Sequence, residues 1–275
     1  MSQRKLFMLA LLGASAVHES VAQPGSPQKE VLYKNISFLL DTGLAKDYVG
    51  ETVAAFRLET RTDKPDGVAP EHIVIRFLES YVPRARSELH GSNAVPTIFF
   101  FPIAEERDKK FTEDFPPVRR AADDLKTYLT RRSHPAGEAI PFLPWGDVNQ
   151  AFVGKRKILR FRNGRGVLFL TQYDQEQRSV NNSALVYTFQ GMTDDNAWYV
   201  SAVFPVSAPG LPQTDAGGKG EKFSRGYKAY ITGVAEQLER LSARSYTPNL
   251  ILFENIVRSI KVPGRVAGSS GVLPR

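Results

Sequence analysis

The sequence predicts an α+β domain built on a largely antiparallel sheet flanked by helices. Strand-like segments come first along the chain, one amphipathic helical segment interrupts them, and two more helical segments follow near the C-terminus. A parallel sheet would instead alternate strands and helices. With 275 residues, 42% hydrophobic and 24% charged, the composition is that of an ordinary globular protein.

The first 22 residues have the layout of a secretory signal peptide. Arg4 and Lys5 precede an apolar run over 6–12, and Ser20-Val21-Ala22 fits the small-x-small cleavage pattern. The alternative is a short membrane anchor, but the run is shorter than the roughly 20 residues that a spanning helix needs. We therefore expect cleavage after Ala22, a flexible leader over 23–30, and a secreted or periplasmic protein with no transmembrane segment.

The absence of cysteine narrows the possible chemistry. It excludes disulfide scaffolds, thiolate metal sites, thiol nucleophiles and a lipid-modified N-terminal cysteine. An exported protein without disulfides is more typical of a bacterial envelope than of a eukaryotic secretory route.

The predicted domain covers 31–262 and opens with four strands, each an apolar-rich or alternating run bounded by turn residues. They cover 31–40, 52–58, 72–77 and 96–103, with a turn at 41–43 and a loop over 61–70. Pro102 predicts that the fourth strand ends at a sheet edge or a bulge, because proline cannot donate a ladder hydrogen bond.

The segment 114–132 is predicted to be a helix. Pro116 and Pro117 suit its first turn, where no N–H is needed, and Arg131 and Arg132 are expected in its last turn. Apolar residues recur three and four positions apart along one face. This face consists of Val118, Ala121, Ala122, Leu125, Tyr128 and Leu129.

Two hairpins are expected next. The first joins 158–162 to 167–173 through Asn163-Gly164-Arg165-Gly166, because Asn-Gly between apolar runs favours a turn. The second joins 184–190 to 197–206, whose inner face consists of Trp198, Val200, Ala202 and Phe204.

Two helices close the domain. The first is expected to end near Ser245, and the second follows Thr247-Pro248, a predicted N-cap and first helical residue. The Gly/Ser/Pro-rich tail over 263–275 is expected to be disordered.

Four segments resemble a family of exported bacterial proteins, many of them lipoproteins. They are PFLPW at 141–145, YTFQGMTDD at 187–195, SAVFPVSAPGLP at 201–212 and YTPNLILFENIVRSIKV at 246–262. No activity is assigned to the family, and a lipid anchor does not carry over to a chain without cysteine. The closing ENIVRSIKV is also similar to the end of the PsbP/Mog1-like sandwich, which implies an antiparallel sheet flanked by helices and no particular function.

Motifs for catalysis or metal binding are absent from the sequence. The histidines lack metal-ligand spacing, and no GxSxG surrounds a serine. The sequence therefore predicts no metal and no cofactor, and favours a protein that acts by binding or structure. One alternative is an envelope enzyme whose carboxylates, such as Glu79, Asp147 and Asp174, converge only in the folded chain. Another is assembly with an envelope protein through a sheet edge.

A basic run over 155–165 is the most distinctive feature of a chain whose net charge is +7. Its predicted anion-binding residues are Lys155, Lys157, Arg160, Arg162 and Arg165. On a strand, Arg160 and Arg162 would share one face while Leu159 and Phe161 point the other way. For an exported protein we expect anionic lipid headgroups or envelope polysaccharides as partners, rather than nucleic acid. The alternative is a solvated strand face that discourages edge pairing.

Phe142 and Trp145 form a second candidate site. They lie in PFLPWGD at 141–147, a segment with two prolines just before the first hairpin. These aromatic side chains are predicted either to line a ligand pocket or to fill the edge of the core.

Overall fold

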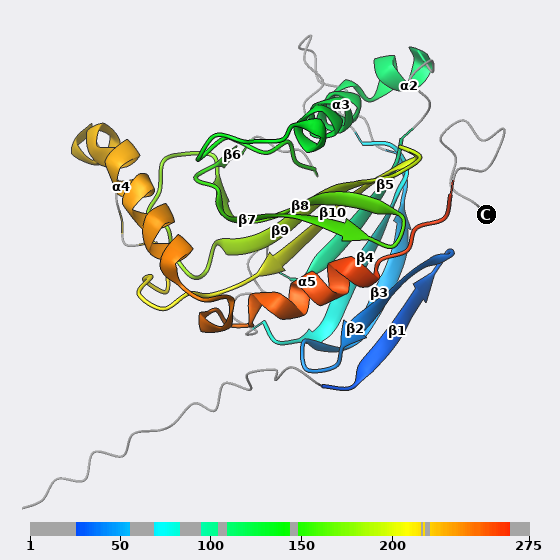
Figure 1. Cartoon of the computed structure of the whole chain (residues 1–275), viewed down its shortest axis with the longest axis horizontal. Coiled ribbons are helices and arrows are strands. Elements are labelled where there is room, and N and C mark those ends of the chain that lie inside the picture. The colour runs from blue at the N-terminus through cyan, green and yellow to red at the C-terminus, as the bar shows by residue number, and fades with distance from the viewer. Residues whose placement is uncertain are drawn as a thin grey trace, which may run out of the picture.

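The computed structural model describes residues 26–55, 69–82, 95–103, 109–143, 148–215, 217 and 221–264. The predicted signal peptide, Trp145, Asp147 and the tail from residue 265 onward lie outside these residues. In the described chain, an eight-stranded antiparallel sheet and a separate two-stranded sheet are flanked by four α-helices (Figure 1), which confirms the predicted α+β class. None of these helices is both long and apolar enough to span a membrane.

Within the described residues, ten strands and four α-helices follow one another. The strands are β1 Gln28–Tyr33, β2 Ile36–Asp41, β3 Ala45–Val53, β4 His72–Ser80, β5 Thr97–Pro102, β6 Asn149–Gln150, β7 Gly154–Phe161, β8 Gly164–Asp174, β9 Leu185–Thr193 and β10 Trp198–Pro205. The helices are α2 Lys109–Asp114, α3 Pro116–Thr130, α4 Glu221–Arg240 and α5 Leu250–Ser259, with a 3₁₀ turn η1 at Ala243–Ser245.

The large sheet has the order β3-β4-β5-β10-β9-β8, and both β6 and β7 pair with the outer side of β8. The predicted β9–β10 hairpin is confirmed by pairing from Tyr199–Met192 to Pro205–Val186. β5 lies inside the sheet, so the expectation of an edge or bulge at Pro102 is wrong. Its proline is accommodated because Pro102 is the last residue of the strand, opposite Trp198.

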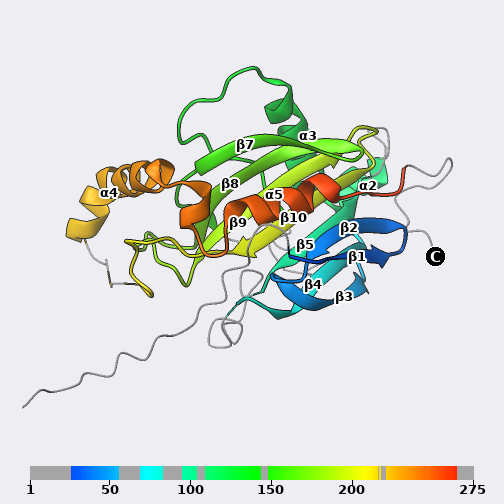
Figure 2. The same ribbon diagram turned by 60° about the horizontal axis from the view of Figure 1, so that its bottom comes forward.

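Two apolar cores cover the two faces of the large sheet. The first lies between the sheet, α5 and the β1–β2 hairpin, and includes the stacked rings of Phe204 and Phe253, whose centroids are 4.6 Å apart. The second lies under α3 and includes Leu125 and Tyr199. Figures 1 and 2 show α3 and α5 on opposite sides of the sheet, with α4 projecting from one end. The predicted inner faces of α3 and β10 are buried as expected.

The N-terminal segment differs most from its prediction. A hairpin replaces the single strand expected over 31–40, and β1 already begins at Gln28, inside the predicted flexible leader. Lys34 and Asn35 form its two-residue turn with φ of 47° and 65°, the left-handed pair that a type I′ turn requires. The second strand lies at 45–53 rather than 52–58, of which 56–58 are outside the described residues.

The ends of two helices also differ from prediction. Arg131 follows α3 as its C-cap and pairs with Glu138 at 2.6 Å instead of lying in the last turn. The N-cap of α5 is Asn249, whose side chain accepts a hydrogen bond from the Ile251 N–H, whereas Thr247 forms a β-bridge with Ser207. Asparagine suits this cap because its short side chain reaches the exposed N–H groups of the first turn.

His72 should make stability fall at mildly acidic pH. Its ring is buried against Phe101 with centroids 4.6 Å apart, and Nδ1–H donates to the Pro70 carbonyl oxygen at 2.8 Å. Burial lowers the pKa of His72 in the folded protein below the value of about 6.5 that it has in the unfolded chain. As the pH falls below about 6.5, His72 is therefore protonated in the unfolded chain before it is protonated in the folded protein. Stability is therefore full above that pH and decreases by up to about 1.4 kcal/mol per pH unit as the pH falls.

Urea unfolding at pH 7.5 and pH 5.5 measures this effect in the wild type and in His72→Phe, which keeps an aromatic ring against Phe101. We expect the variant to lose less free energy of unfolding between the two pH values. An identical loss in both proteins would show that His72 does not carry the pH dependence.

Candidate anion-binding grooves

The basic run lies on β7 and on the turn into β8, at the edge of the large sheet. Leu159 and Phe161 are buried and Arg160 is exposed, as the strand periodicity predicts. Phe161 pairs directly with Gly164, so the turn consists of Arg162 and Asn163 and begins one residue before the predicted turn. Because Arg162 lies in the turn, it does not share a strand face with Arg160, contrary to the prediction. The Arg162 N–H donates to the Ile260 carbonyl oxygen at 3.0 Å, which holds the turn beside the end of α5.

Both lysines of the predicted anion site are engaged within the fold. The Lys155 ammonium donates to the carbonyl oxygens of Glu239 and Leu241, where cations stabilise the end of α4. The Lys157 ammonium lies 2.5 Å from the Glu254 carboxylate of α5, whose side chain is largely buried.

Arg156 in the same run is engaged as well. Its guanidinium donates to the carbonyl oxygens of His134 and Pro135 and to the Tyr128 hydroxyl. The cations in the first half of the basic run therefore bind neighbouring segments of the fold. They stabilise the position of β7 and are not free to bind a ligand.

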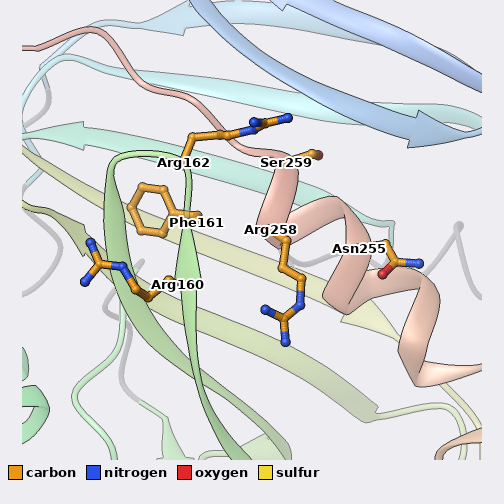
Figure 3. Close-up of a pocket in the computed structure, with 6 residues that line it drawn as sticks. All are labelled: Arg160, Phe161, Arg162, Asn255, Arg258 and Ser259. Carbon is orange, nitrogen blue, oxygen red and sulfur yellow. The ribbon is translucent and has the colours of Figure 1, made fainter.

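A groove of about 450 Å³ lies between the turn and α5, and we call it the α5 groove. Its lining residues are Arg160, Phe161, Arg162, Asn255, Arg258 and Ser259. Figure 3 shows Arg162 extending from the turn and Arg258 extending from α5, with their guanidinium groups directed to opposite ends of the groove in this view, whereas the Arg160 guanidinium points away from α5. Among the residues that the structure describes, neither Arg162 nor Arg258 forms an ion pair with a carboxylate.

A smaller groove of about 230 Å³ lies on the opposite face of the hairpin, beside α3, and we call it the α3 groove. Its polar lining residues include Lys126, Thr130, Arg160, Arg165, Asp194 and Asn196. Arg160 lines both grooves and pairs with Asp194 at 2.8 Å. The α3 groove therefore holds one carboxylate among three cations.

The chemistry of the α5 groove suits an oxyanion. Guanidinium groups are planar, remain charged at all physiological pH values and present parallel N–H donors that match phosphate and carboxylate oxygens. Arg162 and Arg258 supply two such groups, and the exposed amide of Asn255 adds a neutral donor. Arg258 was missed from the sequence because only the docking of α5 against β7 brings it to the turn.

Phe142 is part of a firmly attached segment. Its ring lies against Tyr173 with centroids 4.7 Å apart. The next residue, Leu143, forms two backbone hydrogen bonds with the buried Gln190 side chain: its N–H donates to the Gln190 carbonyl oxygen, and its carbonyl oxygen accepts from the Gln190 amide. These contacts favour the core-edge alternative for Phe142. Its predicted partner Trp145 lies outside the described residues.

The carboxylates of the enzyme alternative do not meet in the described structure. Glu79 in β4 is exposed and lies 3.3 Å from Lys46, and three strands separate β4 from β8, which ends at Asp174. Asp147 lies outside the described residues. Burial raises the pKa of Asp174, and a hydrogen bond from Ser179 lowers the pKa of Asp215 near it. Neither carboxylate lines the α5 groove or the α3 groove.

No protein-family model matches this chain, and no curated protein is significantly similar to it. The resemblance to exported bacterial proteins and to the PsbP/Mog1-like sandwich therefore stays a prediction. Within the described residues, no three acidic or histidine side chains lie close enough together to hold a metal ion.

Proposed function

We propose that the protein is an exported, non-catalytic binding protein of the bacterial envelope that recognises an anionic group. Phosphate and carboxylate groups of this kind occur on lipid headgroups and on envelope polysaccharides. The proposed location rests on the signal-like residues 1–22 and on the resemblance to exported proteins.

One observation carries the proposal: the α5 groove joins three arginines with no carboxylate in its described lining. The net charge of +7 on its own would support only weak, non-specific attraction, because exposed charges are screened by salt. Arg162 and Arg258 line one groove, form no ion pair with a described carboxylate, and therefore offer a localised site instead. Lys155, Arg156, Lys157 and Arg160 of the hairpin have internal partners and therefore contribute less to it.

Pyrophosphate is a suitable first probe because it presents phosphate oxygens without an attached lipid or sugar, so it tests for anion binding alone. We expect calorimetry to detect its binding to the wild type, and the double variant Arg162→Gln/Arg258→Gln to bind at least about tenfold more weakly, since charge-assisted hydrogen bonds contribute about 1.5–3 kcal/mol each. Both side chains are exposed, so the variant should unfold at the wild-type temperature.

The matched control is Arg225→Gln/Arg244→Gln. It removes the same charge from exposed positions of α4 and η1 and should bind pyrophosphate as the wild type does. Equal weakening in both double variants would mean that only net charge matters, and would contradict a site at the α5 groove.

A further inference from the structure

The α5 groove and the α3 groove open on opposite faces of the same hairpin tip. The α5 groove is walled by Asn255, Arg258 and Ser259 of α5, which covers one face of the sheet. The α3 groove is walled by Lys126 and Thr130 of α3, which covers the other face. Figure 1 shows the two helices on opposite sides of the β7–β8 hairpin. A flat surface pressed against one groove would therefore leave the other facing away.

Cations continue from one groove to the other around the tip. Arg162 and Arg258 belong to the α5 groove, Lys126 and Arg165 belong to the α3 groove, and Arg160 lines both. Together they make five cations, with Asp194 as the one carboxylate in the described lining of either groove. A ligand that carries a single anionic group fills one groove and leaves the remaining cations unused.

From this arrangement we infer that the ligand is a linear polyanion, an acidic polysaccharide chain that passes around the hairpin tip and places anionic groups in both grooves. The inference rests on the proposed function and narrows its ligand from any anionic group to a chain of them. Joining anionic groups in one chain makes the second contact intramolecular, so affinity rises steeply once the chain spans both sites.

Asp194 acts in this arrangement as an internal competitor of the ligand. It pairs with Arg160 at 2.8 Å, and the two side chains keep 66% (Arg160) and 52% (Asp194) of their surface exposed. An ion pair this exposed contributes little to stability, so a ligand anion can take the place of the Asp194 carboxylate at small cost. Removing that carboxylate should therefore favour the ligand.

Linear oligomers of a uronic acid test the inference, because they carry one carboxylate per sugar and differ only in length. We expect octamers to bind the wild type at least about tenfold more tightly than dimers at equal carboxylate concentration. Lys126→Gln/Arg165→Gln in the α3 groove should remove most of this length dependence while leaving pyrophosphate binding in the α5 groove unchanged. Asp194→Asn should bind octamers a few-fold more tightly than the wild type.

A failure of the polyanion inference gives a different result from a failure of the proposed function. If octamers and dimers bind equally while pyrophosphate still requires Arg162 and Arg258, the polyanion inference is wrong and the proposed function stands. Tighter binding to phosphatidylglycerol vesicles than to octamers, through the same arginines, would replace the polysaccharide with a membrane surface and overturn the inference. If pyrophosphate does not bind at all, the proposed function itself is wrong.

Discussion

Gln190→Leu should lower the free energy of unfolding by about 2–4 kcal/mol, because it leaves several buried polar groups without their partner. Gln190 is 1% exposed, on the sheet face covered by α3. Its carbonyl oxygen accepts from the Leu143 N–H at 3.0 Å and from the Tyr199 hydroxyl at 2.8 Å. Its amide donates to the Ser201 hydroxyl at 3.0 Å. Leucine has a similar volume but can replace none of these hydrogen bonds.

Gln150→Leu is the matched control for this change. Gln150 also holds the backbone of the same segment, at Ile140, but it is only half-buried, so water can replace its hydrogen bonds. Chemical denaturation should therefore show a clearly smaller loss for Gln150→Leu. Hydrogen exchange should report faster exchange of the Leu143 amide in Gln190→Leu. Equal losses in the two variants would mean that the buried network does not hold the segment.

Gly166→Ala should lower the free energy of unfolding by about 3 kcal/mol or more, because the contact between β8 and β9 has no room for a methyl group. Gly166 of β8 lies opposite Gly191 of β9. A Cβ atom on Gly166 would lie 2.4 Å from the Gln190 carbonyl oxygen and 2.5 Å from the Phe189 ring. The first contact is with backbone, so the two strands would have to move apart in the middle of the ladder.

The matched control is Gly226→Ala on α4, where an added Cβ meets no atom within 4 Å. Alanine is the better helix former, so this variant should gain about 0.5–1 kcal/mol. The two variants make the same chemical change and should shift the unfolding midpoint in opposite directions. A wild-type midpoint for Gly166→Ala would contradict the close strand contact.

The sequence predicted best those elements whose burial follows a short local period. The inner faces of α3 and β10 were recognised because apolar residues recur every three or four residues in the helix and every second residue in the strand. The β1–β2 turn was missed because its left-handed residues are Lys34 and Asn35, without the glycine that usually marks such a turn. Asn-Gly at 163–164 predicted a turn slightly too late, because Gly164 is the first residue of β8, where it pairs with Phe161 and packs closely against the Phe161 ring and the Met192 carbonyl oxygen.

The candidate site was predictable only in part. A run of cations along the chain is visible in the sequence, but which cations remain free depends on carboxylates and carbonyl oxygens brought to them by folding. Glu254 of α5 binds Lys157, and the end of α4 holds Lys155, whereas Arg162 lines the α5 groove without a described carboxylate partner. Arg258 comes from a helix far along the chain, and no local pattern connects it to the hairpin.

Arginine side-chain NMR tests the central claim most directly, because it reports each guanidinium separately during titration with pyrophosphate. We predict that the Nε–Hε signals of Arg162 and Arg258 shift together and saturate with one common affinity, while those of Arg225 and Arg244 do not move. Uniform small shifts of all exposed arginines, without saturation, would show that the protein attracts anions only through its net charge and would contradict a binding site at the α5 groove.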